Sequence, residues 1–379
     1  MKTLFKVVAI LVLGLGVGAV AFWGFTKTQF YTKVQRQEVG VVQEALPILY
    51  VIDPDVGPMM KPHTKIHFKT PRFDNTVVTN ADGFTGRDYA LETRNYRIAI
   101  LGDSAVEAYS VPDTSRFPHM TEYLIYEKTK GRRKVEVMGF GVSGWGNVQH
   151  YGALRKYVLK YKPDEVWIMF LPTNETGDNT PLMNAPPAGP YFIYKSPDSN
   201  EIVDIKFGWP DVPQAMETER KRRYGGYLQD TWGKWNGALL PYFWSPESSV
   251  QWDLVMDHTY QTLGLIKKLC DEHHARVVLV YRATGYDQNQ GNFDQMKNDA
   301  AKFLGRELPM ERELGMKRFR KRVEAMGIEF VNTLEMKDSG IQTKADEGES
   351  KKHVELANFF ADEIIRRLDA KDRAGAAKK

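Results

Sequence analysis

The chain has 379 residues, of which 42% are hydrophobic and 26% are charged, and its formal net charge is +4. This length allows one large domain with additions, or two domains. Because both signs of charge are interspersed and no motif of a nucleic-acid-binding module occurs, we expect no nucleic acid partner. The single cysteine, Cys270, excludes an internal disulfide, and we interpret it as a core residue.

Residues 1–26 are predicted to be an N-terminal membrane anchor or signal peptide. Two lysines precede an uncharged apolar run over 7–25, which as a helix nearly crosses the ~30 Å hydrocarbon core of a bilayer. Trp23 is typical of an interfacial anchor. Ala19-Val20-Ala21 also has the form of a cleavage site, so secretion after cleavage is the alternative. We favour an anchor retained in the inner membrane, with the remaining chain on the periplasmic side, because the apolar run continues past Ala21.

Residues 27–90 are expected to form a stalk and an N-terminal extension. Several prolines between 50 and 70 break any helix there. His63 and His67 lie four residues apart, but the pattern around them indicates extended chain. On extended chain this spacing does not bring two imidazoles to one metal ion. We therefore expect no metal site and no cofactor.

The region 91–368 contains five apolar stretches that predict buried strands. These stretches lie at 97–101, 134–138, 165–171, 276–281 and 328–331, and helical patterns separate them. The alternation predicts a three-layer α/β/α fold around a five-stranded parallel sheet. Loops with Ser104, Gly144 and Asn174 follow the first three strands and are expected to meet at one edge, where ligands gather. The last residues, 369–379, are predicted to be a disordered tail.

An aromatic-rich insertion over 180–250 interrupts this pattern. Its rings include those of Tyr191, Trp209, Tyr227, Trp232, Phe243 and Trp244. Such rings are suited to floor a substrate groove over the carboxyl edge of the sheet, and they are equally suited to a small subsidiary core. The basic run 220–223 is interpreted as a solvated face, with contact to anionic lipid or polymer as the alternative.

Four positions carry a family resemblance. Gly102-Asp103-Ser104, Gly144, Asn174 and His353 resemble, in residue type and order, the signature residues of the SGNH (GDSL) hydrolases. The sequence Asn80-Ala81-Asp82-Gly83-Phe84 is also similar to a turn in members with an N-terminal membrane segment. The resemblance covers 80–179 most fully and 252–368 more weakly. It implies the SGNH hydrolase fold, with flavodoxin-like strand order.

The resemblance implies a role for each of these residues. Ser104 is the expected nucleophile, and His353 is the expected base, because a serine hydroxyl attacks an ester only after a neighbouring group takes its proton. The backbone N–H groups of Ser104 and Gly144 and the side-chain amide of Asn174 are expected to bind the oxyanion. The Gly-x-Ser-x-Gly elbow of the α/β-hydrolases is absent from the sequence.

The chain departs from the family pattern ahead of the histidine. Members usually carry an aspartate three residues before it, whereas this chain has Ser350. Asp346, Glu347 or Glu349 can substitute if the loop folds back, and a backbone carbonyl is the other option. Glu175 likewise stands where the family has an aspartate. Because a mispaired histidine costs a serine protease ~10⁴ in turnover, a slow or degenerate enzyme is one possible outcome.

The sequence therefore predicts an exported serine esterase that removes O-acyl groups, foremost acetyl, from a cell-envelope or extracellular carbohydrate. Two alternatives are kept because a fold does not determine a function. One is an O-acyltransferase that uses the same residues. The other is a catalytically degenerate protein that binds or scaffolds carbohydrate. The expected partners are the acylated carbohydrate and the cytoplasmic membrane.

Overall fold

The computed structural model describes residues 49–69, 73–181, 190–207, 218, 221–223, 239–335 and 349–376. Its centre is a five-stranded sheet. In chain order the strands are β5 (Tyr96–Gly102), β6 (Val135–Gly141), β7 (Glu165–Phe170), β10 (Arg276–Tyr281) and β11 (Glu329–Asn332). Each strand lies within a few residues of the apolar stretch that predicted it.

All neighbouring strands of this sheet are parallel, and their order is β11-β10-β7-β5-β6. Within this sheet the first strand in chain order, β5, therefore lies between the second and the third, β6 and β7, which confirms the predicted flavodoxin-like order. Every residue of the central strand β7 is buried. Burial on both faces explains why the strands read as continuous apolar runs rather than as alternating patterns.

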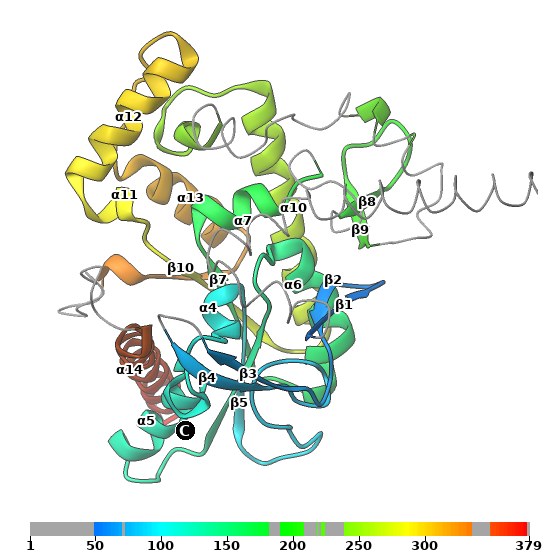
Figure 1. Ribbon diagram of the computed structural model, residues 1–379, viewed down its shortest axis with the longest axis vertical. Coiled ribbons are helices and arrows are strands. Elements are labelled where there is room, and N and C mark those ends of the chain that lie inside the picture. Colours follow the sequence, from blue (N-terminus) through cyan, green and yellow to red (C-terminus); the bar gives the residue numbers. More distant parts are fainter. Residues whose placement is uncertain are drawn as a thin grey trace, which may run out of the picture.

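Helices cover both faces of the sheet (Figure 1). α5 (Phe117–Lys128) and α14 (Glu349–Ala376) pack side by side on one face, called here the α14 face. α6 (Asn147–Ala153), α10 (Val250–Glu272) and α13 (Leu314–Ala325) belong to the core on the other face. The predicted three-layer α/β/α architecture is therefore confirmed.

The remaining elements are short strands and helices around this core. The strands pair as the antiparallel hairpins β1 (Tyr50–Asp53) with β2 (Gly57–Met60), β3 (Lys65–Lys69) with β4 (Asp74–Val78), and β8 (Tyr191–Tyr194) with β9 (Ile202–Lys206). The helices are α4 (Ser104–Glu107), η1 (Asp113–Ser115), η2 (Leu154–Val158), η3 (Leu159–Tyr161), α7 (Pro172–Asp178), η5 (Leu240–Trp244), α11 (Gly285–Gln288), α12 (Gln290–Leu304) and η6 (Thr333–Glu335).

The C-terminal tail differs from its prediction. Residues from 369 onward were expected to be disordered, but α14 continues to Ala376. Arg133 explains the extension, because its guanidinium pairs with Asp369 and with Asp372 at 2.6 Å each. The predicted anchor over 7–25 lies outside the described residues. Within the described ranges, no helix is both long and apolar enough to cross a membrane.

The described part of the insertion contributes to the main core. Phe243 and Trp244 of η5 are buried there, and the Trp244 indole N–H donates to Asp287 at 2.9 Å. Phe243 packs so closely on Gly315 of α13 that a Cβ at that position would collide with its ring. These rings therefore fill a core, which is larger than the subsidiary one that was expected. Most of the segment 208–238 lies outside the described residues.

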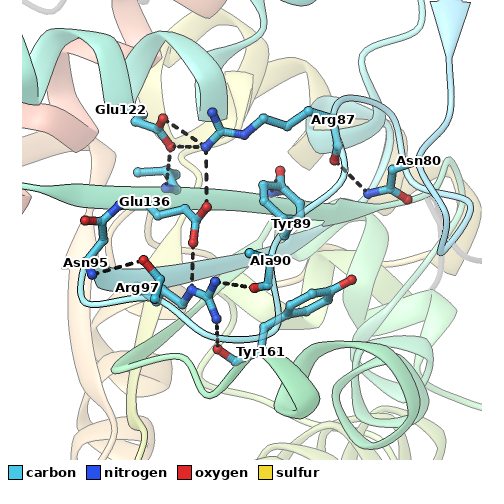
Figure 2. A network of polar contacts seen from close by, with 12 residues as sticks. Asn80, Arg87, Tyr89, Ala90, Asn95, Arg97, Glu122, Glu136 and Tyr161 are labelled. Atoms are coloured by element: carbon cyan, nitrogen blue, oxygen red, sulfur yellow. Dashed lines mark hydrogen bonds and ion pairs between the residues drawn. The ribbon is translucent and has the colours of Figure 1, made fainter.

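A polar network ties the N-terminal extension to the amino end of the sheet (Figure 2). Arg97 of β5 is 2% exposed, and its Nε lies 2.6 Å from Glu136 on β6. The same guanidinium donates to the backbone carbonyls of Ala90, Leu91 and Tyr161. A buried guanidinium is tolerated only when its donors are satisfied in this way.

Candidate active site

The loops that follow four adjacent strands meet at the carboxyl edge of the sheet. Across the edge in strand order they contain Arg282 after β10, Asn174 after β7, Asp103 and Ser104 after β5, and Gly144 after β6. The Asn174 side-chain amide donates to Asp103 Oδ2 at 3.0 Å. The structure thus brings the third predicted loop into direct contact with the turn that carries Ser104.

Close packing of α4 explains the glycine of the Gly-Asp-Ser turn. Gly102 and Gly141 are register partners on β5 and β6, and a Cβ on either would collide with Val106. Asp103 caps α4 by accepting the Ala105 N–H at 3.0 Å. Ser104 is consequently the first residue of a helix that sits directly on the sheet, and it is partly exposed.

Glu107 fixes the glycine-rich loop relative to Ser104. It lies on α4 with Ser104, and its buried carboxyl group accepts from the Ser143 N–H at 2.6 Å and from the Ser143 hydroxyl. Tyr50 of β1 donates to its other oxygen. Burial raises the pKa of Glu107, although these donors oppose the shift. Gly144 follows with φ of 84°, a conformation that favours glycine.

The second and third loops are joined by a reciprocal amide pair. Asn179 Oδ1 accepts the Asn147 backbone N–H at 2.6 Å, and Asn179 Nδ2 donates to Asn147 Oδ1 at 2.9 Å. Gly146 leaves room for this pair, since a Cβ there would lie 2.8 Å from Asn179 Oδ1. The loops with Gly144 and Asn174 are therefore held together by buried hydrogen bonds.

His353 lies on the α14 face and stacks on Phe117. The ring centroids are 5.9 Å apart with an interplanar angle of 22°, and His353 is 7% exposed. The Phe117 backbone N–H donates to His353 Nδ1 at 3.3 Å. An imidazole that accepts at Nδ1 carries its hydrogen on Nε2 in the neutral form. Within the described part of the chain, no hydrogen bond joins Ser104 Oγ to His353.

The acids proposed to orient His353 lie largely outside the residues that the structure describes. Asp346 and Glu347 precede the described start of α14. Glu349 begins that helix, but its side chain is not among those described. Ser350 is exposed. The predicted roles of these residues, of His353 and of the oxyanion donors stay predictions.

Two buried histidines are neutral, and neither was predicted to act. Burial lowers the pKa of His150 on α6 to about 4, against smaller opposing effects from the Gly102 backbone and Asp103. Burial likewise lowers the pKa of His258 on α10 to about 3. His258 Nδ1 lies 3.0 Å from Thr180 Oγ1. Both rings are therefore uncharged at neutral pH.

Two further residues at this edge received no role from the sequence: Glu175, noted only as a departure from the family pattern, and Arg282. Glu175 is 1% exposed, and its Oε2 accepts the Leu171 N–H at 2.6 Å while its Oε1 is buried without a hydrogen-bond partner. Burial, and then the nearby charge of Asp103, raise its pKa well above the usual range. Arg282 places Nη1 3.4 Å from Asp103 Oδ1. For Arg282, the only signal in the sequence was its position directly after the fourth apolar stretch.

A separate cleft lies beside the start of α5. Its lining includes Arg87, Asp113, Arg116, His119 and Glu122, and none of the predicted site residues. Arg87 pairs with Glu122 at 2.9 Å, and Arg116 pairs with Asp113. A hydrogen bond to Asp113 raises the pKa of His119. The charges of this cleft thus pair with one another.

Comparison with known proteins finds similarity only among solved structures. No protein-family model and no curated protein matches the sequence. The structure is similar to the psychrotrophic esterase EstA from Pseudoalteromonas (12% identity, 72% of this chain, 98% of that chain, TM-score 0.36). It is also similar to an acetyl xylan esterase (12% identity, 70% of this chain, 98% of that chain, TM-score 0.34). A third similar structure is the lipase/acylhydrolase from Enterococcus faecalis (15% identity, 73% of this chain, 96% of that chain, TM-score 0.36). Any activity of this chain therefore has to be argued from its own residues.

Proposed function

We propose that the protein is a serine ester hydrolase with Ser104 as its nucleophile. The observation that carries the proposal is the assembly around Ser104. Glu107 on the same helix holds the loop of Gly144, and the Asn174 amide binds the adjacent Asp103. Backbone N–H groups and a side-chain amide beside a serine are the donors that acyl transfer uses to stabilise an oxyanion.

In this proposal Ser104 Oγ attacks the carbonyl carbon of an ester while His353 takes the hydroxyl proton. The resulting oxyanion is bound by the N–H groups of Ser104 and Gly144 and by Asn174. His353 returns the proton to the departing alcohol, which leaves an acyl-serine. Water then attacks the acyl group with help from the same imidazole, and the free acid is released.

This role requires His353 to change its hydrogen-bonding state. A base needs a free lone pair on the nitrogen that faces the serine, whereas Phe117 donates to Nδ1 and leaves the hydrogen on Nε2. For Nε2 of His353 to take the proton of Ser104, the ring must therefore change to the other tautomer or rotate. Ser350, which stands where the family has an aspartate, favours a second candidate, the degenerate binding protein.

The proposed substrate is an O-acetylated carbohydrate outside the cytoplasmic membrane. The apolar run over 7–25 supports export on an N-terminal anchor, with secretion after cleavage as the variant. Besides the aromatic residues that the core buries, the sequence of the insertion contains Trp209, Tyr227 and Trp232, and these support contact with sugar rings.

A fluorophosphonate probe tests the nucleophile. We expect it to label the wild-type protein and to spare Ser104→Ala, while Ser115→Ala in η1 is labelled as strongly as the wild type. Equal labelling of the wild type and Ser104→Ala removes Ser104 from the mechanism. Release of acetate from acetylated oligosaccharide, without formation of new acetyl esters, separates hydrolysis from transfer. Retention of polysaccharide with no turnover of a nitrophenyl ester identifies the degenerate alternative.

A further inference from the structure

We infer that Arg282 selects substrates whose alcohol part carries a carboxylate close to the scissile ester, such as an O-acylated acidic saccharide. The inference rests on the proposed function, because it assigns a substrate class to the same site. It adds a specificity residue that lies outside the predicted nucleophile, base and oxyanion donors.

The backbone holds Arg282 firmly at the carboxyl edge. Its N–H donates to the Phe170 carbonyl at 2.8 Å and so continues the pairing of β10 with β7 by one residue. Along β10, Val278 and Val280 belong to the core of the α14 face, whereas Leu279 and Tyr281 belong to the opposite core. The alternation of a strand therefore directs Arg282 towards the α14 face, which also carries His353.

The guanidinium has donors to spare. Its side chain is 29% exposed, and within the described part of the chain its one hydrogen bond joins Nη1 to Asp103 Oδ1 at 3.4 Å. Asp103 already accepts shorter bonds, at 3.0 Å each, from the Ala105 N–H and the Asn174 amide. Arginine has five N–H donors in a planar fork that matches a carboxylate, so most of the fork is available to a ligand.

The charges around the edge favour this role for Arg282. No other Lys or Arg occurs in the segments 103–108, 142–147, 171–178, 282–288 and 333–335 that follow the strands. The acids Glu107 and Glu175 are buried, and the pKa of each is raised, which favours their neutral forms. The same segments contain the further acids Asp103, Asp178, Asp287 and Glu335. Of these, Asp103 is the one that pairs with Arg282, and two other donors already bind it. Among the described residues of these segments, a substrate carboxylate beside Ser104 would therefore meet one partly exposed cation, Arg282.

Two acetyl esters that differ only in charge test the inference. 4-Acetoxybenzoate carries a carboxylate and 4-acetoxybenzamide does not. Each enzymatic rate is divided by the rate at which hydroxide hydrolyses the same ester, so that the two esters are compared at equal intrinsic reactivity. We expect kcat/KM of the wild type to favour the benzoate by about tenfold, the scale of one hydrogen bond to a charged group. Arg282→Gln should abolish this preference, because the benzoate then loses the ion pair that the benzamide never forms.

Further variants separate a binding role from a structural one. Arg282→Lys keeps the charge without the fork and should retain part of the preference. Lys302→Gln, an exposed change on α12, is the matched control and should leave both rates unchanged. Equal normalised rates for both esters in the wild type overturn the inference. An equal loss for both esters in a folded Arg282→Gln protein also overturns it, because Arg282 would then only position Asp103.

Failure of the proposed function gives a different result. If Ser104→Ala hydrolyses both esters as fast as the wild type, Ser104 is not the nucleophile. Ligand-observed NMR with 4-hydroxybenzoate and 4-hydroxybenzamide then still tests Arg282. Preferential binding of the benzoate that Arg282→Gln removes supports the inference, and equal binding of the two phenols overturns it.

Discussion

The two ends of the central sheet differ in how completely the buried polar groups are hydrogen-bonded. At the amino end, Arg97 is enclosed by Glu136 and by backbone carbonyls, and Glu165 accepts from the Tyr96 hydroxyl and the Trp167 indole at 2.7 Å each. At the carboxyl end, Glu175 Oε1 is buried without a partner, and Arg282 keeps unused donors. The network around Arg97 is closed, although Arg367, which pairs with Glu165 and Glu329 at the same end, has two buried nitrogens without a hydrogen-bond partner. At the carboxyl end the unmatched atoms belong to Glu175 and Arg282, beside the loop of Ser104.

This difference separates stability from function within one sheet. Closed networks hold the native state, because removing one member leaves its partner buried and unpaired. Unmatched groups lower stability and are expected where a ligand completes the site. Mutations at the amino end should therefore change the free energy of unfolding, and mutations at the carboxyl end should change turnover.

Arg97→Ala should give the largest change in stability. It leaves Glu136 with only the longer ion pair to Arg87, at 3.6 Å, and it removes the donor from the carbonyls of Ala90, Leu91 and Tyr161. We expect the free energy of unfolding to fall by ~3–5 kcal/mol. Urea unfolding measures this loss. The double variant Arg97→Met, Glu136→Leu should recover most of it, because no charge is then left unpaired. A loss below 1 kcal/mol in Arg97→Ala, as for an exposed ion pair, contradicts the closed network.

Asn174→Ala tests the carboxyl end. Loss of one oxyanion donor should lower kcat by about 10²–10³-fold on a nitrophenyl ester. The urea midpoint should shift little, since Asp103 keeps its bond to Ala105. Thr173→Ala is the neighbouring control and should leave kcat unchanged. A large loss of stability with unchanged kcat in the remaining folded protein makes Asn174 a structural residue and refutes this comparison.

Acid should destabilise the fold through its buried histidines. His258 has a folded pKa of about 3 and a model-peptide pKa of 6.5. Below pH 6.5 the unfolded chain binds a proton that the folded chain does not, so stability falls as the pH falls towards the folded pKa, by up to about 1.4 kcal/mol per pH unit. His258→Asn should show a weaker decline between pH 6.5 and 4.5 in urea titrations. An unchanged slope assigns the decline to other groups.

Ser350→Asp should produce the smallest effect and the only gain. A carboxylate one helical turn before His353 can stabilise the imidazolium that forms during attack. We expect kcat on a nitrophenyl ester to rise about tenfold, the effect of one charge-assisted hydrogen bond. Ser350→Asn supplies the same shape without charge and should leave kcat near the wild-type value. A gain of the same size in the Asn variant rules out a charge effect.

The sequence was sufficient for the fold because the strands carry their own signal. β7 and β10 are buried almost throughout, so their apolar runs were readable without knowledge of their neighbours. The Gly-Asp-Ser turn was likewise readable, and Gly102 has a local cause in the close packing of Val106. The tail was misjudged because the ion pairs of Arg133 with Asp369 and Asp372 join residues distant in the chain.

The sequence by itself determined the five strands, their helices and the serine at the end of the first strand, because apolar periodicity and turn residues act locally. Only the tertiary structure decided the surroundings of that serine. The bonds of Glu107 to Ser143, of Asn174 to Asp103, of Arg282 to Asp103 and of Phe117 to His353 each join separate elements. No local pattern encodes such contacts, since they exist only once parallel strands place their ends side by side.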